Sequence, residues 1–194
     1  WGDYSNSKIK KTNFWKDFEY RLIDSIEYRT KQHLHKERDN YFLAFGEADE
    51  LPGLFIQKVG RVILTQIYCG YWRSQDKVLA KTIQRICQDR FPDEKLEYLF
   101  QSRNKQTQLE VNHLDYKGKL HKLQNNIKLI IQEFGLNYHL EFGKWYDFGI
   151  YSDMSSIRKK ITKEWKEGET TLNLFSYTGA FSTQALKSGH SEVH

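Results

Sequence analysis

The most informative stretch of the chain is Thr171-Leu-Asn-Leu-Phe-Ser-Tyr-Thr-Gly179-Ala-Phe-Ser-Thr-Gln-Ala-Leu-Lys-Ser-Gly189. Its first half holds a short apolar run, Leu172–Phe175, of the length of a strand, and its second half repeats apolar residues at helical spacing. Gly179 lies at the turn between the halves, and Gly189 fits the left-handed position that ends a helix. The pattern predicts a buried strand, a turn with one glycine, and a helix.

The predicted turn is also a candidate anion site. The first N–H groups of a helix have no acceptor within the helix, and together with the helix dipole they favour a carboxylate or a phosphate. Many α/β proteins carry such a turn for packing alone, so the spacing by itself leaves both interpretations open.

The residue types around the turn add a resemblance. The run Asn173–Ser182, Asn-Leu-Phe-Ser-Tyr-Thr-Gly-Ala-Phe-Ser, resembles the first cofactor motif of class I S-adenosylmethionine (SAM)-dependent methyltransferases. Its particular form is similar to the 23S rRNA cytosine-C5 methyltransferase family and its rRNA-methylating relatives. The resemblance implies that SAM is the cofactor and that its methionine part is surrounded by Phe175, Ser176, Tyr177 and Gly179.

A second informative stretch is Gly149-Ile-Tyr-Ser-Asp-Met-Ser-Ser-Ile-Arg158. Helix-start residues followed by apolar residues at helical spacing predict a strand that ends near Ser152 and then a helix. The stretch is similar to a Gly-aromatic-Tyr-Leu-Asp-Gln-Arg segment of the same family, although Met-Ser replaces the Gln-Arg. This resemblance implies that Asp153 and Arg158 lie beside the cofactor, with Arg158 expected to bind its carboxylate through a planar fork.

The earlier part of the chain predicts an α+β domain. An amphipathic helix is expected over 14–35, with Trp15 and Tyr28 as packing residues, and a second helix over 78–91. Three strands joined as hairpins are expected between 41 and 68, and further strands between 97 and 141. The run Phe45–Leu54 again resembles the same family, in which it opens the substrate-side domain. Its acidic residues Glu47, Asp49 and Glu50 indicate a solvated turn rather than a metal or acid/base site.

A cluster of basic residues suggests a nucleic-acid partner. Few acidic residues accompany Arg103, Lys105, Lys117, Lys119 and Lys122. Such a patch can bind RNA phosphates, although a charge run can also be a solvated face. The net charge of +5 permits an RNA partner without requiring one.

Length and composition exclude several classes of protein. The chain of 194 residues suits one large or two small domains, and 39% hydrophobic residues support a core. No apolar run reaches membrane-spanning length and no signal peptide is evident, so a cytoplasmic protein without a membrane partner is expected. Cys69 and Cys87 are too few for a disulfide framework and lack metal-site spacing, so they are expected to be small buried hydrophobes and no metal site is predicted.

The two ends of the chain carry expectations from the resemblance. Trp1–Ser5 looks like the exit from a small RNA-binding PUA domain, and Ser191–His194 looks like the second strand of a Rossmann-like domain. The catalytic residues are therefore expected beyond His194. One strand and one helix cannot bury both faces of a sheet, so the apolar run Leu172–Phe175 needs partners. They would come from further parts of a longer polypeptide, from the middle domain, or from a second copy in a homodimer.

The sequence as a whole predicts an α+β middle domain followed by the start of an α/β Rossmann-like methyltransferase domain. The expected boundaries are 1–37 for an N-terminal segment and helix, 38–151 for the substrate-side domain, and 152–194 for the opening part of the SAM-binding domain. The expected function is SAM-dependent methylation of an RNA base, in rRNA, by a protein of which this chain is a fragment. The alternative is a non-catalytic RNA-binding or assembly module that does not bind the cofactor. A nicotinamide dinucleotide is disfavoured, because one glycine replaces the Gly-x-Gly-x-x-Gly pattern.

Overall fold

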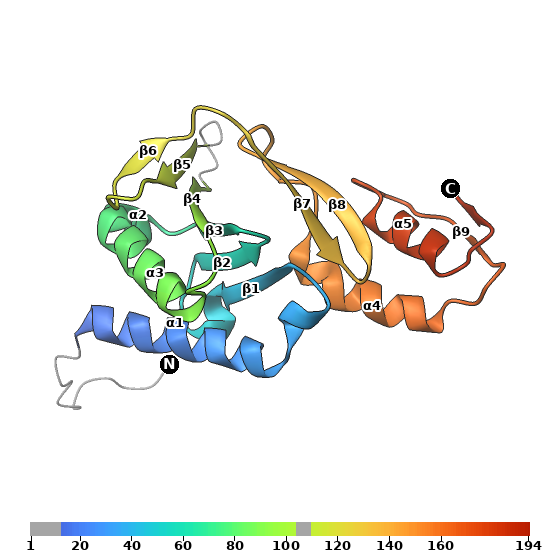
Figure 1. The fold of residues 1–194 in the computed structure, drawn as a ribbon, viewed down its shortest axis with the longest axis horizontal. Coiled ribbons are helices and arrows are strands. Elements are labelled where there is room, and N and C mark those ends of the chain that lie inside the picture. The colour runs from blue at the N-terminus through green and yellow to red at the C-terminus, as the bar shows by residue number, and fades with distance from the viewer. Residues whose placement is uncertain (1–12, 104–109) are drawn as a thin grey trace, which may run out of the picture.

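The computed structural model describes residues 13–103 and 110–194. The expectations for residues 1–5, for Lys105 and for residues 108–109 within the strands predicted between 97 and 141 lie outside this range. Figure 1 shows the arrangement of the elements. The helices are α1 (Phe14–Lys31), α2 (Gly70–Ser74), α3 (Asp76–Arg90), α4 (Ser155–Glu164) and α5 (Ala180–Lys187), with short 3-10 turns η1 (Leu34–Lys36), η2 (Gly46–Asp49) and η3 (Ser152–Met154). The strands are β1 (Asn40–Phe45), β2 (Leu54–Val59), β3 (Val62–Ile67), β4 (Glu97–Ser102), β5 (Glu110–Leu114), β6 (Leu120–Lys122), β7 (Ile127–Glu133), β8 (Leu136–Phe142), β9 (Thr170–Thr171) and β10 (Glu192–Val193).

A six-stranded sheet forms the middle of the molecule, in the order β1-β2-β3-β4-β5-β6. Strands β1, β2 and β3 pair antiparallel, which confirms the two predicted hairpins. Strands β3 and β4 pair parallel, because α2 and α3 carry the chain back to the same end of the sheet. The predicted helix over 78–91 is thus the crossover helix α3.

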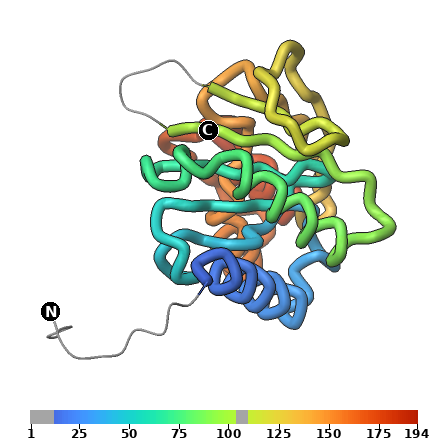
Figure 2. Tube along the Cα trace, turned by 90° about the vertical axis from the view of Figure 1, so that its left-hand side faces the viewer, coloured from blue at the N-terminus to red at the C-terminus, as the bar shows by residue number. Residues whose placement is uncertain are grey.

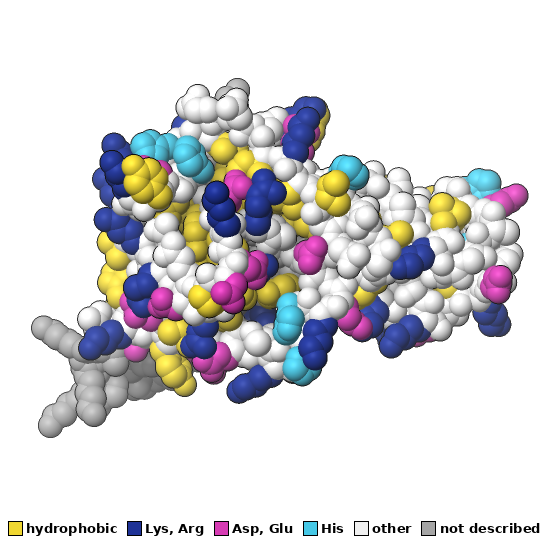
Figure 3. Space-filling view, in the orientation of Figure 1, with side chains coloured by type: hydrophobic (Ala, Val, Ile, Leu, Met, Phe, Trp, Pro, Cys, Tyr) yellow, Lys and Arg dark blue, Asp and Glu magenta, His cyan; other side chains and the backbone are white. Residues whose placement is uncertain are grey.

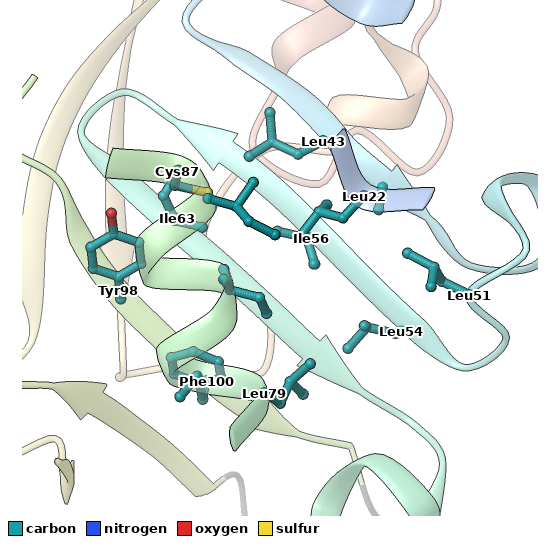
Figure 4. Close-up of a cluster of buried hydrophobic side chains, with 14 of the residues drawn as sticks. Leu22, Leu43, Leu51, Leu54, Ile56, Ile63, Leu79, Cys87, Tyr98 and Phe100 are labelled. Atoms are coloured by element: carbon teal, nitrogen blue, oxygen red, sulfur yellow. The ribbon is translucent and has the colours of Figure 1, made fainter. Parts of the chain in front are cut away.

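Helices α1 and α3 cover one face of the sheet. Figure 4 shows Leu79 and Cys87 of α3 over Ile56 and Ile63 of the strands. On α1 the buried positions are Phe18, Leu22 and Ile26, at the spacing that the amphipathic pattern predicts. Cys87 is fully buried, as expected for a small hydrophobe, whereas Cys69 is partly exposed.

The hairpin β7–β8 covers the opposite face. Along β3, Ile63 faces the helices and Leu64 faces the hairpin, as the two-residue period of a strand requires. In Figure 1 and Figure 2 the sheet lies between α1 and α3 on one side and β7–β8 with α4 and α5 on the other. The predicted turn at Glu133–Leu136 joins β7 to β8, with Phe134 and Gly135 at φ +50° and +75°.

The last part of the chain forms a small βα unit. Strand β9 pairs parallel with β10, and α5 connects them, as expected for the opening of a Rossmann-like domain. Helix α5 rests on β8, where Ala180 is buried and the Tyr138 hydroxyl lies 3.4 Å from the Ala180 carbonyl oxygen. The predicted second strand at Ser191–His194 is therefore confirmed as β10.

Three expectations about local structure are wrong. The predicted buried strand ends at Thr171, and Leu172, Leu174 and Phe175 are 69%, 68% and 100% exposed, because β9 pairs only with β10 and no described layer covers it. The strand expected near Ser152 is irregular chain, since Gly143 and Gly149 take left-handed φ values of +94° and +118°. Tyr28 is 61% exposed because α1 turns that side toward solvent.

No helix in the described part of the chain is both long enough and apolar enough to cross a membrane. Helix α1 shares one core with the sheet. The domain boundaries at 37 and 151 stay predictions.

Candidate functional site

The stretch that resembles a cofactor motif forms a tight, exposed loop between β9 and α5. Phe175 and Tyr177 take positive φ values of +62° and +51°, which are uncommon for residues other than glycine. The Gly179 N–H donates to the Ser176 carbonyl oxygen at 2.7 Å and closes the turn. Such backbone conformations cost free energy and concentrate at ligand-binding sites, so the loop is a candidate site on its geometry.

Gly179 leaves space at the start of α5. It has φ +79°, and a Cβ atom placed there would meet only the Ser182 Cβ, at 4.0 Å. The first N–H groups of α5 have no acceptor within the helix. Open space and free donors at a helix N-terminus fit an anionic group such as the carboxylate of SAM.

The structure brings the second stretch beside this loop. The Thr178 hydroxyl donates to the Gly149 carbonyl oxygen at 2.6 Å, and the rings of Tyr151 and Tyr177 lie 4.9 Å apart. Partial burial raises the pKa of both phenols above its ordinary value, so both remain neutral hydrogen-bond donors at physiological pH. The two stretches that resemble methyltransferase motifs thus lie side by side.

The third stretch that resembles the family, Phe45–Leu54, shares a pocket with the second stretch. Asp153 is exposed, and its carboxylate accepts the Met154 N–H at 3.1 Å. It lines a pocket of about 240 Å³ together with Phe45 from the third stretch, Phe45–Leu54. We call this cavity the aromatic pocket; its lining includes Phe45, Gln57, Gln66, Tyr68, Arg103 and Tyr151.

Arg158 corrects the expectation for the cofactor carboxylate. Its side chain is 1% exposed, and its Nε and Nη2 groups donate to the two carboxylate oxygens of Glu133 at 2.6 and 3.0 Å. The planar fork is therefore already occupied by a carboxylate of the same chain. Arg158 lies behind the loop, 5.6 Å from the centre of the Phe181 ring, and supports the site from below.

The predicted basic patch is partly correct. Lys117, Lys119 and Lys122 are exposed on the β5–β6 hairpin, where Figure 3 shows Lys and Arg side chains beside histidines at the upper left. Arg103 does not belong to this patch, because its side chain is 3% exposed and pairs with Asp147 at 3.3 Å. Asp115 shapes the hairpin turn; the Lys119 N–H and then His121 hold the pKa of its carboxyl below the usual range.

The acidic turn after β1 is more ordered than expected. Asp49 binds Arg29 through two contacts of 2.7 and 3.1 Å and is only 15% exposed, so it is a structural ion pair and not a solvated residue. Glu47 accepts the Gly53 N–H at 3.2 Å. Among the residues that the structure describes, no group of three or more His, Cys, Asp or Glu side chains is placed to bind a metal ion.

The sequence interpretation missed the polar side chains below the site. Glu133 is fully buried although it ends a strand, and Gln57 and Gln66 are buried within strands. Polar residues at the buried positions of a strand are unusual, and that irregularity is the signal that could have identified them.

Comparisons with known proteins agree with the motifs. No family model matches the chain. A ribosomal RNA large subunit methyltransferase I of Shewanella amazonensis is 27% identical over 100% of this chain and 48% of its own length. The protein of the same name from Shigella flexneri is 28% identical over 80% of this chain and 37% of its own length.

Two solved structures share the fold. One, named "a putative SAM-dependent methyltransferase" from Streptococcus mutans, has a TM-score of 0.72 at 22% identity, over 92% of this chain and 43% of that one. Another, named a "putative methyltransferase complexed with SAH", has a TM-score of 0.68 at 22% identity, over 90% of this chain and 43% of that one. The chain spans less than half the length of these relatives. The comparisons confirm the resemblance: this chain is similar in sequence to bacterial rRNA large subunit methyltransferases and shares the fold of the corresponding part of the Streptococcus mutans structure named a SAM-dependent methyltransferase.

Proposed function

We propose that this chain is the substrate-side and cofactor-entry part of a SAM-dependent methyltransferase that acts on a base of RNA, within rRNA. The observation that carries the proposal is the similarity over the whole chain to a ribosomal RNA large subunit methyltransferase. The convergence of three motif-like stretches on one site supports it.

The proposed cofactor residues are those of the loop and its neighbour. The open N-terminus of α5 at Gly179 would bind the SAM carboxylate, and Asp153 would accept hydrogen bonds from its ammonium or hydroxyl groups. Phe175, Ser176 and Tyr177 would surround the methionine part. When bound, SAM supplies an electrophilic methyl group. The role of the chain is to hold the cofactor and the base in line, and positioning of this kind supplies much of the rate of such reactions.

The proposed RNA contacts are the exposed lysines of the β5–β6 hairpin, Lys117, Lys119 and Lys122. Lysines without close acidic partners bind phosphates and steer RNA toward a site. Tyr116 is 87% exposed at the tip of the same hairpin, with the Lys117 ammonium 5.4 Å from its ring centre, and offers a surface on which a base can stack. An rRNA substrate also favours a cytoplasmic location. A homodimer stays a prediction.

A pair of glycine substitutions tests the proposed function. Gly179 and Gly168 have nearly the same positive φ, +79° and +81°, and neither has a crowded Cβ position. Gly179→Ala and Gly168→Ala therefore introduce similar backbone strain, but only Gly179 lies in the proposed cofactor site. In the protein at the length at which its source cell makes it, we expect transfer of radioactive methyl groups from SAM to rRNA to fall at least tenfold in Gly179→Ala and to stay near wild type in Gly168→Ala.

A non-catalytic RNA-binding module is the second candidate, favoured by the exposed lysines. It predicts RNA binding that weakens steeply with salt, together with no methyl transfer by wild-type protein at the length at which its source cell makes it. That result would contradict the methyltransferase proposal.

A further inference from the structure

The aromatic pocket has a polar floor built by one face of the sheet. On β2, Gln57 lies on the same face as Phe55, because side chains two residues apart in a strand share a face. Phe55 is paired with Gln66 of β3. Gln66 is in turn paired with Gln101 of β4. The three glutamines therefore project to the same side, and they are 3%, 8% and 5% exposed. A row of three buried amides in a sheet whose buried positions are mostly apolar requires an explanation, because burial of a polar group is costly unless its hydrogen bonds are made.

The amides bond to one another, and one acceptor remains. Gln57 Nε2 lies 3.4 Å from the end of the Gln66 amide, and the Gln66 amide lies 2.8 Å from Gln101 Oε1. With the Gln66 amide turned so that its oxygen faces Arg103, that oxygen accepts from Arg103 Nη2 at 2.5 Å and from Arg103 Nε at 3.2 Å. Gln101 Nε2 donates to the Tyr146 carbonyl oxygen at 3.0 Å. At the other end of the row, Gln57 Oε1 is buried and has no hydrogen-bond partner within residues 13–103 and 110–194. Gln57 lines the pocket, so this acceptor is available to a ligand there.

Arg103 adds a donor to the same floor. Its guanidinium carbon lies 3.6 Å from the centre of the Tyr146 ring, and its Nη2 donates to Asp147 at 3.3 Å. Its Nη1 is buried and finds no acceptor among the described side chains and backbone. The floor thus combines a fixed cation with a buried amide acceptor.

The mouth of the pocket is aromatic. Phe45, Tyr68 and Tyr151 line it and are 37%, 48% and 45% exposed, although large aromatic side chains are usually covered. Exposed apolar side chains grouped around a cavity mark a binding site, and ring faces bind flat partners by stacking. The volume of about 240 Å³ lies below the roughly 300 Å³ at which pockets for drug-sized ligands begin. The pocket therefore suits a single flat ring system with polar edges.

We propose that the aromatic pocket holds one unstacked nucleobase of an RNA strand, stacked on the rings at its mouth and hydrogen-bonded at its edge by Gln57 and Arg103. Proteins read single-stranded RNA by this combination of aromatic stacking and edge contacts. The proposal rests on the proposed function and adds to it the place where the base is held. The ring of Tyr151 touches Tyr177 of the cofactor loop, so a base in the pocket lies next to that loop. An amide can turn either its oxygen or its nitrogen toward the ligand, so the pocket can accept more than one base.

Equilibrium binding of a short single-stranded RNA of mixed sequence, followed by fluorescence anisotropy, tests the proposal. Tyr68→Ala removes a half-exposed ring of the mouth, and Gln57→Leu removes the unpaired acceptor at similar volume. Tyr20→Ala is the matched control, since Tyr20 is 72% exposed on α1 and lies outside the pocket. We expect Tyr68→Ala to weaken binding by roughly 5- to 100-fold, as loss of a stacking partner does, and Tyr20→Ala to leave it unchanged. Gln57→Leu should weaken binding at least fivefold with an unchanged melting temperature.

The outcomes separate this proposal from the proposed function. One outcome is wild-type protein that binds both SAM and RNA while Tyr68→Ala binds RNA as tightly as Tyr20→Ala does. This result would overturn the proposal of a base in the aromatic pocket and would leave the methyltransferase proposal standing. Wild-type protein, at the length at which its source cell makes it, that binds RNA through Tyr68 but never binds SAM supports the pocket and overturns the methyltransferase proposal. An RNA with one base removed at each position in turn should lose affinity at one position in wild type and at none in Tyr68→Ala; equal losses in both proteins would also overturn the pocket.

Discussion

Arg158 and Glu133 form a two-point ion pair in which both side chains are almost completely buried, with N–O distances of 2.6 and 3.0 Å. Glu133 ends β7, and its carboxylate also accepts the Asn40 amide at 2.9 Å. Arg158 lies in the first half of α4 and donates to the Tyr151 carbonyl oxygen at 3.1 Å. The pair therefore fixes the segment that carries Tyr151 and Asp153 against the hairpin and the sheet.

Removal of one member of this pair should destabilise the protein strongly. Glu133→Leu leaves the Arg158 charge buried without a partner, and the expected loss in the free energy of unfolding is about 3–5 kcal/mol, measured by urea denaturation. Replacement of both members, Glu133→Leu with Arg158→Met, should restore most of that stability. The exposed pair Arg61–Glu97 is the control, and its disruption should cost about 1 kcal/mol or less. A Glu133→Leu protein as stable as the control variant would show that the ion pair does not hold the segment.

Charge reversal on the β5–β6 hairpin should weaken RNA binding. Lys117, Lys119 and Lys122 changed together to Glu should lower RNA affinity and reduce the slope of log affinity against log salt by about one for each phosphate that the protein no longer neutralises. The same change at Lys160, Lys163 and Lys166, which lie on and just after α4, away from the hairpin, should have a smaller effect. Equal losses from the two triple variants would indicate a general charge effect and no specific interaction.

Burial raises the pKa of the Cys87 thiol to about 12, whereas the thiol of an unfolded chain titrates near about 8.5. Between these two pKa values the unfolded chain loses the thiol proton while the folded protein keeps it. The contribution of the neutral Cys87 thiol to the free energy of unfolding is therefore complete below about pH 8.5 and is lost as the pH rises toward 12. The free energy of unfolding should therefore fall by up to about 1.4 kcal/mol per pH unit above pH 8.5. In Cys87→Ala this alkaline decline should be smaller, as urea denaturation at pH 7.5, 9 and 10 will show; identical declines in both proteins would refute the assignment.

The exposed apolar run after β9 should contribute little to stability by itself. Leu174→Ala is expected to change the free energy of unfolding by less than about 0.5 kcal/mol, because the side chain is 68% exposed. Leu99→Ala, the matched change at a fully buried leucine of the sheet, should cost about 2–5 kcal/mol. If the two substitutions cost the same in urea denaturation, Leu174 is buried in solution, as the sequence pattern predicts.

The sequence predicted elements well where one local pattern dominates. Leu22 and Ile26 of α1, Leu79 and Ile83 of α3, and the strand pairs of the first hairpins follow helical or two-residue periods, and burial confirms those periods. The prediction of a buried strand at Leu174 is wrong because burial of a strand depends on neighbouring layers, which a local apolar run does not reveal.

The site was predictable only in part, for a similar reason. The loop around Gly179 has a sequence signature, since few residues other than glycine accept its φ. The pairing of Arg158 with Glu133 joins residues 25 positions apart and leaves no local pattern. The charge of Arg103 is visible in the sequence and predicts an exposed residue. Its burial by Tyr146 and Asp147 depends on the tertiary fold, which the local sequence does not reveal.

Calorimetric titration of SAM and of S-adenosylhomocysteine tests whether the loop at Gly179 binds the cofactor, with the protein at the length at which its source cell makes it and with Gly168→Ala as the folded control. We expect saturable binding of both molecules by wild type and by Gly168→Ala, and binding weakened at least tenfold in Gly179→Ala. Folded wild-type protein that binds RNA but neither SAM nor S-adenosylhomocysteine would contradict the account and would favour a non-catalytic RNA-binding module.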